Sequence, residues 1–100
     1  MSEKTTEEMM QDKGLNAPRL TPTLIDETIA KEYYHIVPNT TMTLCVLTLN
    51  NGFQVTGESA AVSMDNFDEE IGMEVARENA REKIWQLEGY LLKNKLYREE

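Results

Sequence analysis

The stretch "TGESAA" at residues 56–61 is the part of the sequence that most nearly matches a catalytic motif. Its Gly57-Glu58-Ser59-Ala60-Ala61 approaches the G-x-S-x-G nucleophile elbow, with alanine in the last glycine position. A serine nucleophile needs a histidine base oriented by an acid, on a strand–turn–helix of a large parallel sheet. The only histidine is His35, and the context predicted for Ser59 is the end of a hairpin strand. We therefore expect no catalytic residue and no enzyme, with Glu58 and Ser59 hydrogen-bonding locally or facing a partner.

The other residue types that support chemistry are scattered along the chain. A single His and a single Cys at unrelated positions provide no zinc site. The acidic segment "DNFDEE" at residues 65–70 lacks the D-x-D-x-D-G spacing of an EF-hand loop. Gly52 and Gly57 stand alone, so the sequence has no glycine-rich phosphate loop. We expect neither a metal nor a cofactor.

Cations on one predicted helix offer a different kind of site. They could hold a small nucleotide between subunits while Trp85 or Tyr34 stacks on the base. An aromatic residue at the position of Trp85 is also typical of a core or an interface. The candidate ligand or partner contacts are Glu58, Ser59, Arg77, Arg81, Lys83 and Trp85.

The charge balance limits the partners. The chain of 100 residues has 10 Lys and Arg against 18 Asp and Glu, for a net charge of −8. Gripping phosphate backbones or an anionic membrane requires clustered cations, so we expect neither direct nucleic-acid binding nor membrane binding. A basic protein surface, or a DNA-binding protein that is being decoyed, is compatible, and excess acid also keeps a small protein soluble. The lone Cys45 suits a reducing cytoplasm, and the sequence shows neither a signal peptide nor an apolar run of the ~20 residues that span a bilayer.

A first helix is predicted over residues 21–36. Thr21 is a good N-cap and Pro22 then occupies the first helical position, where its missing N–H costs nothing. Pro38 ends the helix, because the residue before a proline avoids the α region. One helical face is predicted from the spacing of Ile25, Ile29, Tyr33 and Ile36.

A β-hairpin follows, with strands at residues 41–49 and from residue 53 onward. Asn51-Gly52 is a strong signal for a two-residue type I′ turn. That turn would set Val46 opposite Gly57, and the missing side chain of Gly57 would permit close packing. One face of the hairpin would then carry Met42, Leu44, Val46, Phe53 and Val55, and the other would carry Cys45, Leu47 and Leu49. The first strand would therefore be apolar on both faces. A chain this short can hardly cover both faces, so self-association is predicted.

A long helix is predicted over about residues 67–96, where no proline interrupts the chain. Asn66 and Glu69 have the spacing of a capping box. Glu78 and Arg81 form an i,i+3 pair that we place on the solvent side. The expected core stripe is Ala80, Ile84, Leu87 and Leu91, and a stripe of small residues, Gly72, Ala76 and Ala80, would let either the hairpin or a second copy come close.

Four short motifs together give a family resemblance. They are Asn51-Gly52-Phe53, Gly57-Glu58-Ser59, Asn66-Phe67-Asp68 and the Lys-x-Trp-x-Leu-Glu-Gly-Tyr run of residues 83–90. With these motifs the chain resembles the small tailed-bacteriophage proteins of the gp forty-nine/gene sixty-six-like family, from about residue 18 to the end of the long helix. The resemblance implies a phage origin and a host-cytoplasm setting. It supplies no catalytic residues, because the family's function is uncharacterised.

The predicted fold class is α+β: a helix, an antiparallel β-hairpin and a long C-terminal helix in a single domain over residues 21–100, after a disordered polar arm at residues 1–20. The favoured function is a non-enzymatic phage accessory protein that binds and inhibits or redirects a host bacterial protein, such as a defence protein, in the host cytoplasm. The first alternative is an oligomeric sponge for a small nucleotide signal. The second is an acidic DNA mimic, which needs rows of acids at phosphate-like spacing.

Overall fold

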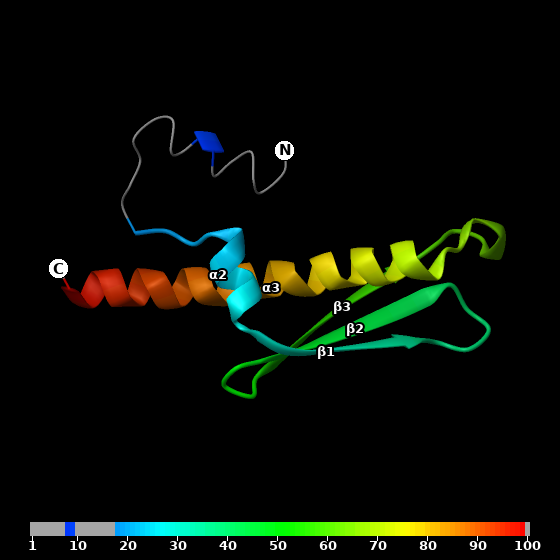
Figure 1. Cartoon of the computed structure of the whole chain (residues 1–100), viewed down its shortest axis with the longest axis horizontal. Coiled ribbons are helices and arrows are strands. Elements are labelled where there is room, and N and C mark those ends of the chain that lie inside the picture. The colour runs from blue at the N-terminus through cyan, green and yellow to red at the C-terminus, as the bar shows by residue number, and fades with distance from the viewer. Residues whose placement is uncertain (1–7, 10–17, 100) are drawn as a thin grey trace.

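The computed structural model describes residues 8–9 and 18–99 and shows an α+β fold (Figure 1). A long helix lies along one face of a three-stranded antiparallel sheet of order β1-β2-β3. The predicted class and long C-terminal helix are confirmed, and most of the predicted arm at residues 1–20 lies outside the described residues. The elements are α2 (Pro22–Glu27), β1 (Ile29–Ile36), β2 (Met42–Leu49), β3 (Gln54–Ala60), a 3₁₀ turn (Met64–Asn66) and α3 (Glu69–Glu99).

The helix predicted over residues 21–36 is wrong beyond its first turns. Thr21 is the N-cap, as predicted, and its hydroxyl accepts a hydrogen bond from the Leu24 amide at 3.2 Å. The helix stops at Thr28, whose amide and hydroxyl both bond back to the Ile25 carbonyl, at 3.1 and 2.7 Å. The next eight residues form β1, because isoleucine and tyrosine favour strands and β2 supplies a full ladder of partners. Of the four residues predicted to form one helical face, Ile25 lies in α2, whereas Ile29, Tyr33 and Ile36 lie in β1.

The hairpin is present, but its register differs by one residue from the prediction. Only Gly52 has positive φ in the turn, at 89°, which excludes the predicted type I′ turn. The loop instead has three residues, closed by a hydrogen bond from the Leu49 amide to the Phe53 carbonyl at 2.7 Å. Gly57 consequently pairs with Cys45 rather than Val46. A shift of one residue turns every β3 side chain to the other face. Val55 and Gly57 therefore share the α3 face with Leu47 and Cys45, whereas Phe53 lies in the turn before β3 and is 56% exposed.

The core lies between the sheet and the first half of α3. Gly57 lies so close to the α3 backbone that a Cβ on this residue would overlap the Ala76 carbonyl and the Ala80 amide. The stripe of small residues therefore packs on the hairpin of its own chain, one of the two predicted arrangements. The helix is capped by Asp68 rather than the predicted Asn66, since the Asp68 carboxylate accepts a hydrogen bond from the Ile71 amide at 3.1 Å. The buried apolar residues are Ile25, Cys45, Leu47, Leu49, Val55, Ala76, Ala80 and Ile84.

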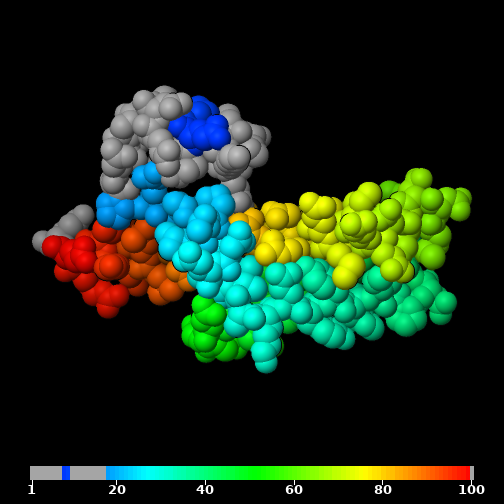
Figure 2. All heavy atoms as spheres, viewed as in Figure 1, coloured from blue at the N-terminus to red at the C-terminus, as the bar shows by residue number. Residues whose placement is uncertain are grey.

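The second half of α3 extends past the strands (Figures 1 and 2). Leu87 and Leu91, predicted as core residues, are 39% and 55% exposed. The sheet ends at the β2–β3 turn, and Ile84 is the last fully buried residue of α3. We call residues 85–99 the overhang.

Candidate functional site

The Gly57-Glu58-Ser59 motif positions α3 on the sheet. The Ser59 hydroxyl donates to the Gly72 carbonyl at 2.7 Å, near the start of α3. One residue earlier, the Glu58 carbonyl accepts a hydrogen bond from the Asn79 side-chain amide at 2.8 Å. Together with the close approach at Gly57, these bonds fix the helix at three consecutive residues of β3. The local hydrogen bonding predicted for Glu58 and Ser59 is therefore present.

Ser59 and His35 lie on opposite faces of the sheet. Ser59 pairs with Thr43 on the face covered by α3, whereas His35 pairs with Leu44, which in turn pairs with Glu58, on the other face. Side chains of adjacent residues in a strand point to opposite faces. The imidazole therefore cannot take a proton from the Ser59 hydroxyl in this fold.

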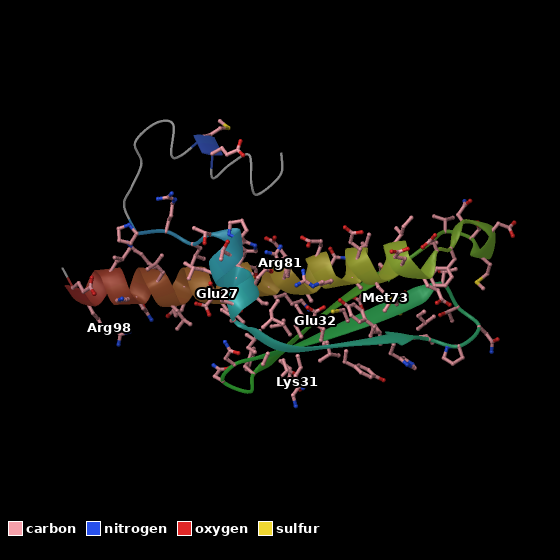
Figure 3. All side chains as sticks on the ribbon, viewed as in Figure 1. Glu27, Lys31, Glu32, Met73, Arg81 and Arg98 are labelled. Carbon is pink, nitrogen blue, oxygen red and sulfur yellow. The ribbon has the colours of Figure 1, made fainter. Side chains whose placement is uncertain are left out.

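The predicted cations Arg77 and Arg81 hold α2 and β1 against α3. Arg81, labelled in Figure 3, is 4% exposed rather than on the solvent side as predicted. Its Nε lies 2.9 Å from Asp26 Oδ1. Its Nη1 lies 3.3 Å from Glu78 Oε2. Arg77 Nε lies 3.1 Å from Glu32 Oε1 on β1. Carboxylates of this chain therefore occupy both guanidinium groups, which limits what they could offer to a nucleotide.

The same cluster shifts the pKa values of three neighbouring groups. The pKa of Glu32 is lowered, first because the Tyr34 hydroxyl donates to its carboxylate at 2.7 Å and second because Arg77 does so. The pKa of Tyr34 is raised by burial and by this bond to Glu32. Burial also raises the pKa of the Cys45 thiol, so this cysteine is a poor nucleophile. The cluster is therefore a set of structural ion pairs in which two arginines face three carboxylates.

The remaining sequence candidates lie apart from the two arginines. Lys83 is on the β3 side of α3, with its Nζ 3.4 Å from the Thr56 hydroxyl. Trp85 is half-buried and packs against the core, as one of its two interpretations predicted. The structure therefore brings Arg77 and Arg81 together but does not bring either of them to Lys83.

A groove that the sequence did not indicate runs between the β2–β3 turn and α3. It consists of two adjoining clefts of about 310 and 200 Å³ that share Phe53 and Leu87. Phe53 is 56% exposed and Tyr90 is 69% exposed, so two aromatic rings lie open to solvent here. We call it the Phe53 groove; it is lined by Leu49, Asn51, Phe53, Gln54, Val55, Thr56, Lys83, Gln86, Leu87, Glu88, Tyr90 and Leu91.

A row of exposed acids follows the outer side of α3. Glu70, Glu74, Glu78 and Glu82 recur every four residues and are all exposed. Four residues of α-helix rise about 6 Å, so the row carries roughly one charge per 6 Å. One DNA strand carries a charge every ~3.4 Å of its axis. The row, which we call the acidic ridge, is therefore too sparse to copy a phosphate backbone.

Searches for metal-ligand clusters and for membrane-spanning helices covered the described residues. Residues 8–9 and 18–99 contain no group of three or more His, Cys, Asp or Glu that could hold a metal ion. None of the helices described in these ranges combines the length and apolar character needed to cross a membrane.

Comparison with known families identifies the chain's relatives. Residues 20–96 match the model of the phage protein family described as N4 Gp49/phage Sf6 gene 66. The chain belongs to this family. The match runs from just before α2 almost to the end of α3, so the core, the arginines and the Phe53 groove all lie within it. Searches among curated proteins and among solved structures gave no match.

The family match confirms the resemblance seen in the sequence, and the fold shows what its motifs do in this chain. Asn51-Gly52-Phe53 forms the β2–β3 turn, and Gly57-Glu58-Ser59 fixes α3 on the sheet. Tyr90, at the end of the residue 83–90 run, lines the Phe53 groove. Packing explains the Gly57-Glu58-Ser59 motif. It does not explain why the rings of Phe53 and Tyr90, in two of the other motifs, are exposed.

Proposed function

We propose that this phage protein is non-enzymatic and acts in the host cytoplasm by binding a host protein through the Phe53 groove. The observation that carries the proposal is the pair of exposed aromatic rings, Phe53 and Tyr90, beside a concave apolar surface. Aromatic anchors in pockets supply most of the affinity of protein interfaces. Exposed apolar surface of this kind is otherwise a liability for a small protein.

The charge of the chain indicates the chemistry of the partner. The net charge of −8 and the acidic ridge favour association with a basic protein and raise its encounter rate. The groove itself carries one cation and one acid on its rim, Lys83 and Glu88, so its specificity comes from shape and apolar contact. We expect the bound segment to present apolar side chains flanked by Lys or Arg.

The two alternative functions have less support. A nucleotide sponge would have to bind cations already paired with carboxylates at Arg77 and Arg81. A DNA mimic would need a denser row of acids than the acidic ridge provides. Binding and inhibiting or redirecting a host protein, such as a defence protein, remains the function that we propose.

Native mass spectrometry of the full chain, purified gently from host lysate, tests the proposal. A complex with one host polypeptide is expected, and the affinity of that polypeptide is then measured with pure components. Tyr90→Ser should weaken binding about 10-fold or more, the loss typical of an interface anchor. Tyr97→Ser is the matched control, because Tyr97 is as exposed, at 70%, but lies outside the groove. Equal losses in both variants, or a bound small molecule in place of a polypeptide, would overturn the proposal.

A further inference from the structure

The face of the sheet opposite α3 is apolar along its central strand. On β2, Thr43, Cys45, Leu47 and Leu49 are buried toward α3, so the alternate residues point the other way. Those residues include Leu44 and Val46, which are half-buried, and Met42, which is 38% exposed. Both α2 and α3 pack on the other side, and no helix or strand of residues 18–99 covers this one (Figure 1). We call it the open face.

The pairing of the strands places side chains of the open face in rows. The first row is His35–Leu44–Glu58 and the second is Tyr33–Val46–Thr56. A third row contains Lys31, whose side chain points away from α3 in Figure 3. A histidine on β1 therefore lies across an apolar centre from a carboxylate on β3, in the same row.

We propose that a second copy of this chain packs on the open face and forms a symmetric dimer. A two-fold axis parallel to β2, between the two sheets, sets β1 of each copy over β3 of the other. Each row then meets itself, so His35 lies over Glu58 of the second copy, at both ends of the row. Val46 and Leu44 meet their own counterparts at the axis. The face is therefore complementary to itself in both charge and apolarity.

A two-fold axis perpendicular to the strands through the centre of the face is less favourable. An axis perpendicular to the strands through Val46 would set β1 over β1 and reverse the rows. His35 would then lie over Lys31 of the second copy, and Glu58 over Gln54. This arrangement pairs two basic groups and leaves the carboxylate without a partner, whereas the parallel axis gives each imidazole an acceptor. An imidazole donates an N–H to a carboxylate in its neutral as well as its protonated form.

The size of the open face sets the expected strength. Strands of eight residues at ~3.4 Å per residue, spaced ~4.8 Å apart, give a face of roughly 27 by 14 Å. Standard stable interfaces bury ~800 Å² on each partner, which this face does not reach. We therefore expect a dimer that dissociates at about micromolar concentration.

Sedimentation velocity of the full chain over about 1–200 μM tests the dimer, because this range spans the expected dissociation constant. The wild type should shift from monomer to dimer with concentration. Val46→Glu sets two like charges together at the axis and should abolish the dimer, with circular dichroism confirming that the variant is folded. Leu91→Glu is the matched control on the overhang and should dimerise like the wild type. A wild type that stays monomeric throughout, or a dimer lost in Leu91→Glu but kept in Val46→Glu, would overturn the proposal.

A charge exchange tests the arrangement of the two copies. His35→Glu should weaken the dimer about 10-fold, because it sets two carboxylates against each other. Adding Glu58→His restores the pair with its members exchanged and should recover affinity to within about 3-fold of the wild type. A double variant as weak as the single one would exclude the parallel axis.

The dimer and the host partner are tested separately, although the two surfaces adjoin at β3, where Gln54 and Thr56 belong to both. The open face and the Phe53 groove share no residue that either test changes, since Tyr90 lies on α3 and Val46 on the outer side of β2. We expect Val46→Glu to lose the dimer and to bind the host protein as the wild type does. We expect Tyr90→Ser to keep the dimer and to bind the host protein more weakly. Each proposal therefore fails or survives by its own variant.

Discussion

The two halves of α3 have the same secondary structure and opposite surroundings. Residues 69–84 lie on the sheet through small side chains, with Ala76 and Ala80 in contact with Gly57. The overhang carries large apolar residues, and Leu91, Tyr90 and Tyr97 are all more than half exposed. Small residues therefore mark the line along which the α3 backbone meets the sheet, whereas the overhang presents large side chains to solvent. Side-chain size alone would have predicted that the half of α3 with the larger apolar residues is the buried half.

The difference separates stability from binding. A backbone-to-backbone contact allows no adjustment, so changes in the first half should act on the free energy of unfolding. The overhang makes fewer contacts with the rest of the chain, so changes there should act on the affinity for a partner rather than on the free energy of unfolding. The following variants test this division.

Gly57→Ala should have the largest effect, because its Cβ would overlap backbone atoms of α3 that cannot move independently. We expect a loss of about 3 kcal/mol or more in the free energy of unfolding. Gly89→Ala is the counterpart in the overhang, where the nearest atom to the new Cβ is Leu20 Cδ1 at 3.8 Å. It should stabilise the protein by about 0.5–1 kcal/mol, since alanine is the better helix former. Urea denaturation measures both, and a similar sign for the two variants would contradict the division.

Arg81→Ala should have an intermediate effect. It removes the closer of the two cations that Asp26 and Glu78 share, leaving only the longer contacts with Arg77, and opens a gap beneath α2. Removing one member of a buried pair costs about 3–5 kcal/mol, but both carboxylates are about half exposed, so we expect about 2 kcal/mol. Arg98→Ala, at the exposed end of the overhang, should change the unfolding free energy by less than about 0.5 kcal/mol. Thermal denaturation of the two variants gives the comparison, and equal values would show that α2 is held by other contacts.

Glu32 should give the smallest effect, visible as a dependence on pH. Its folded pKa lies below the ordinary value of 4.5, so the ionised group stabilises the fold above that value. This contribution is lost as the pH falls from 4.5 through the folded pKa. In Glu32→Gln, the unfolding free energy should fall less steeply with decreasing pH below 4.5 than in the wild type. Glu99→Gln removes a carboxylate from the overhang instead and should keep the wild-type slope. If Glu32→Gln also keeps the wild-type slope, the hydrogen bonds from Tyr34 and Arg77 to Glu32 do not persist in solution.

The long helix and the hairpin were predictable, because their signals are local. No proline interrupts residues 69–99, and Asn51-Gly52 marks the turn. The register was not predictable, because β2 is apolar on both faces and accepts either pairing. Residues 29–36 fit a helix as well as a strand, and only the ladder with β2 decides between them.

The candidate site depended on these undecided features. The register decides whether Phe53 and Val55 share a face with Val46 or with Leu47, which faces α3, so the groove could not be seen before the turn was known. Arg81 resembles a surface residue in the sequence because its partner, Asp26, lies 55 positions away. Ser59 could be assigned a structural role, since the absence of a suitable histidine was visible in the sequence itself.

The order of the strands has a consequence for how the chain folds. Each strand pairs with its neighbour in sequence, so both pairings close short loops and lose little chain entropy. Proteins dominated by such local pairings fold quickly. Only α3 completes the core, however, and it leaves the ribosome after all three strands. Until then Cys45, Leu47 and Val55 face solvent, so the newly made sheet is exposed to aggregation for the time that about 30 residues take to synthesise.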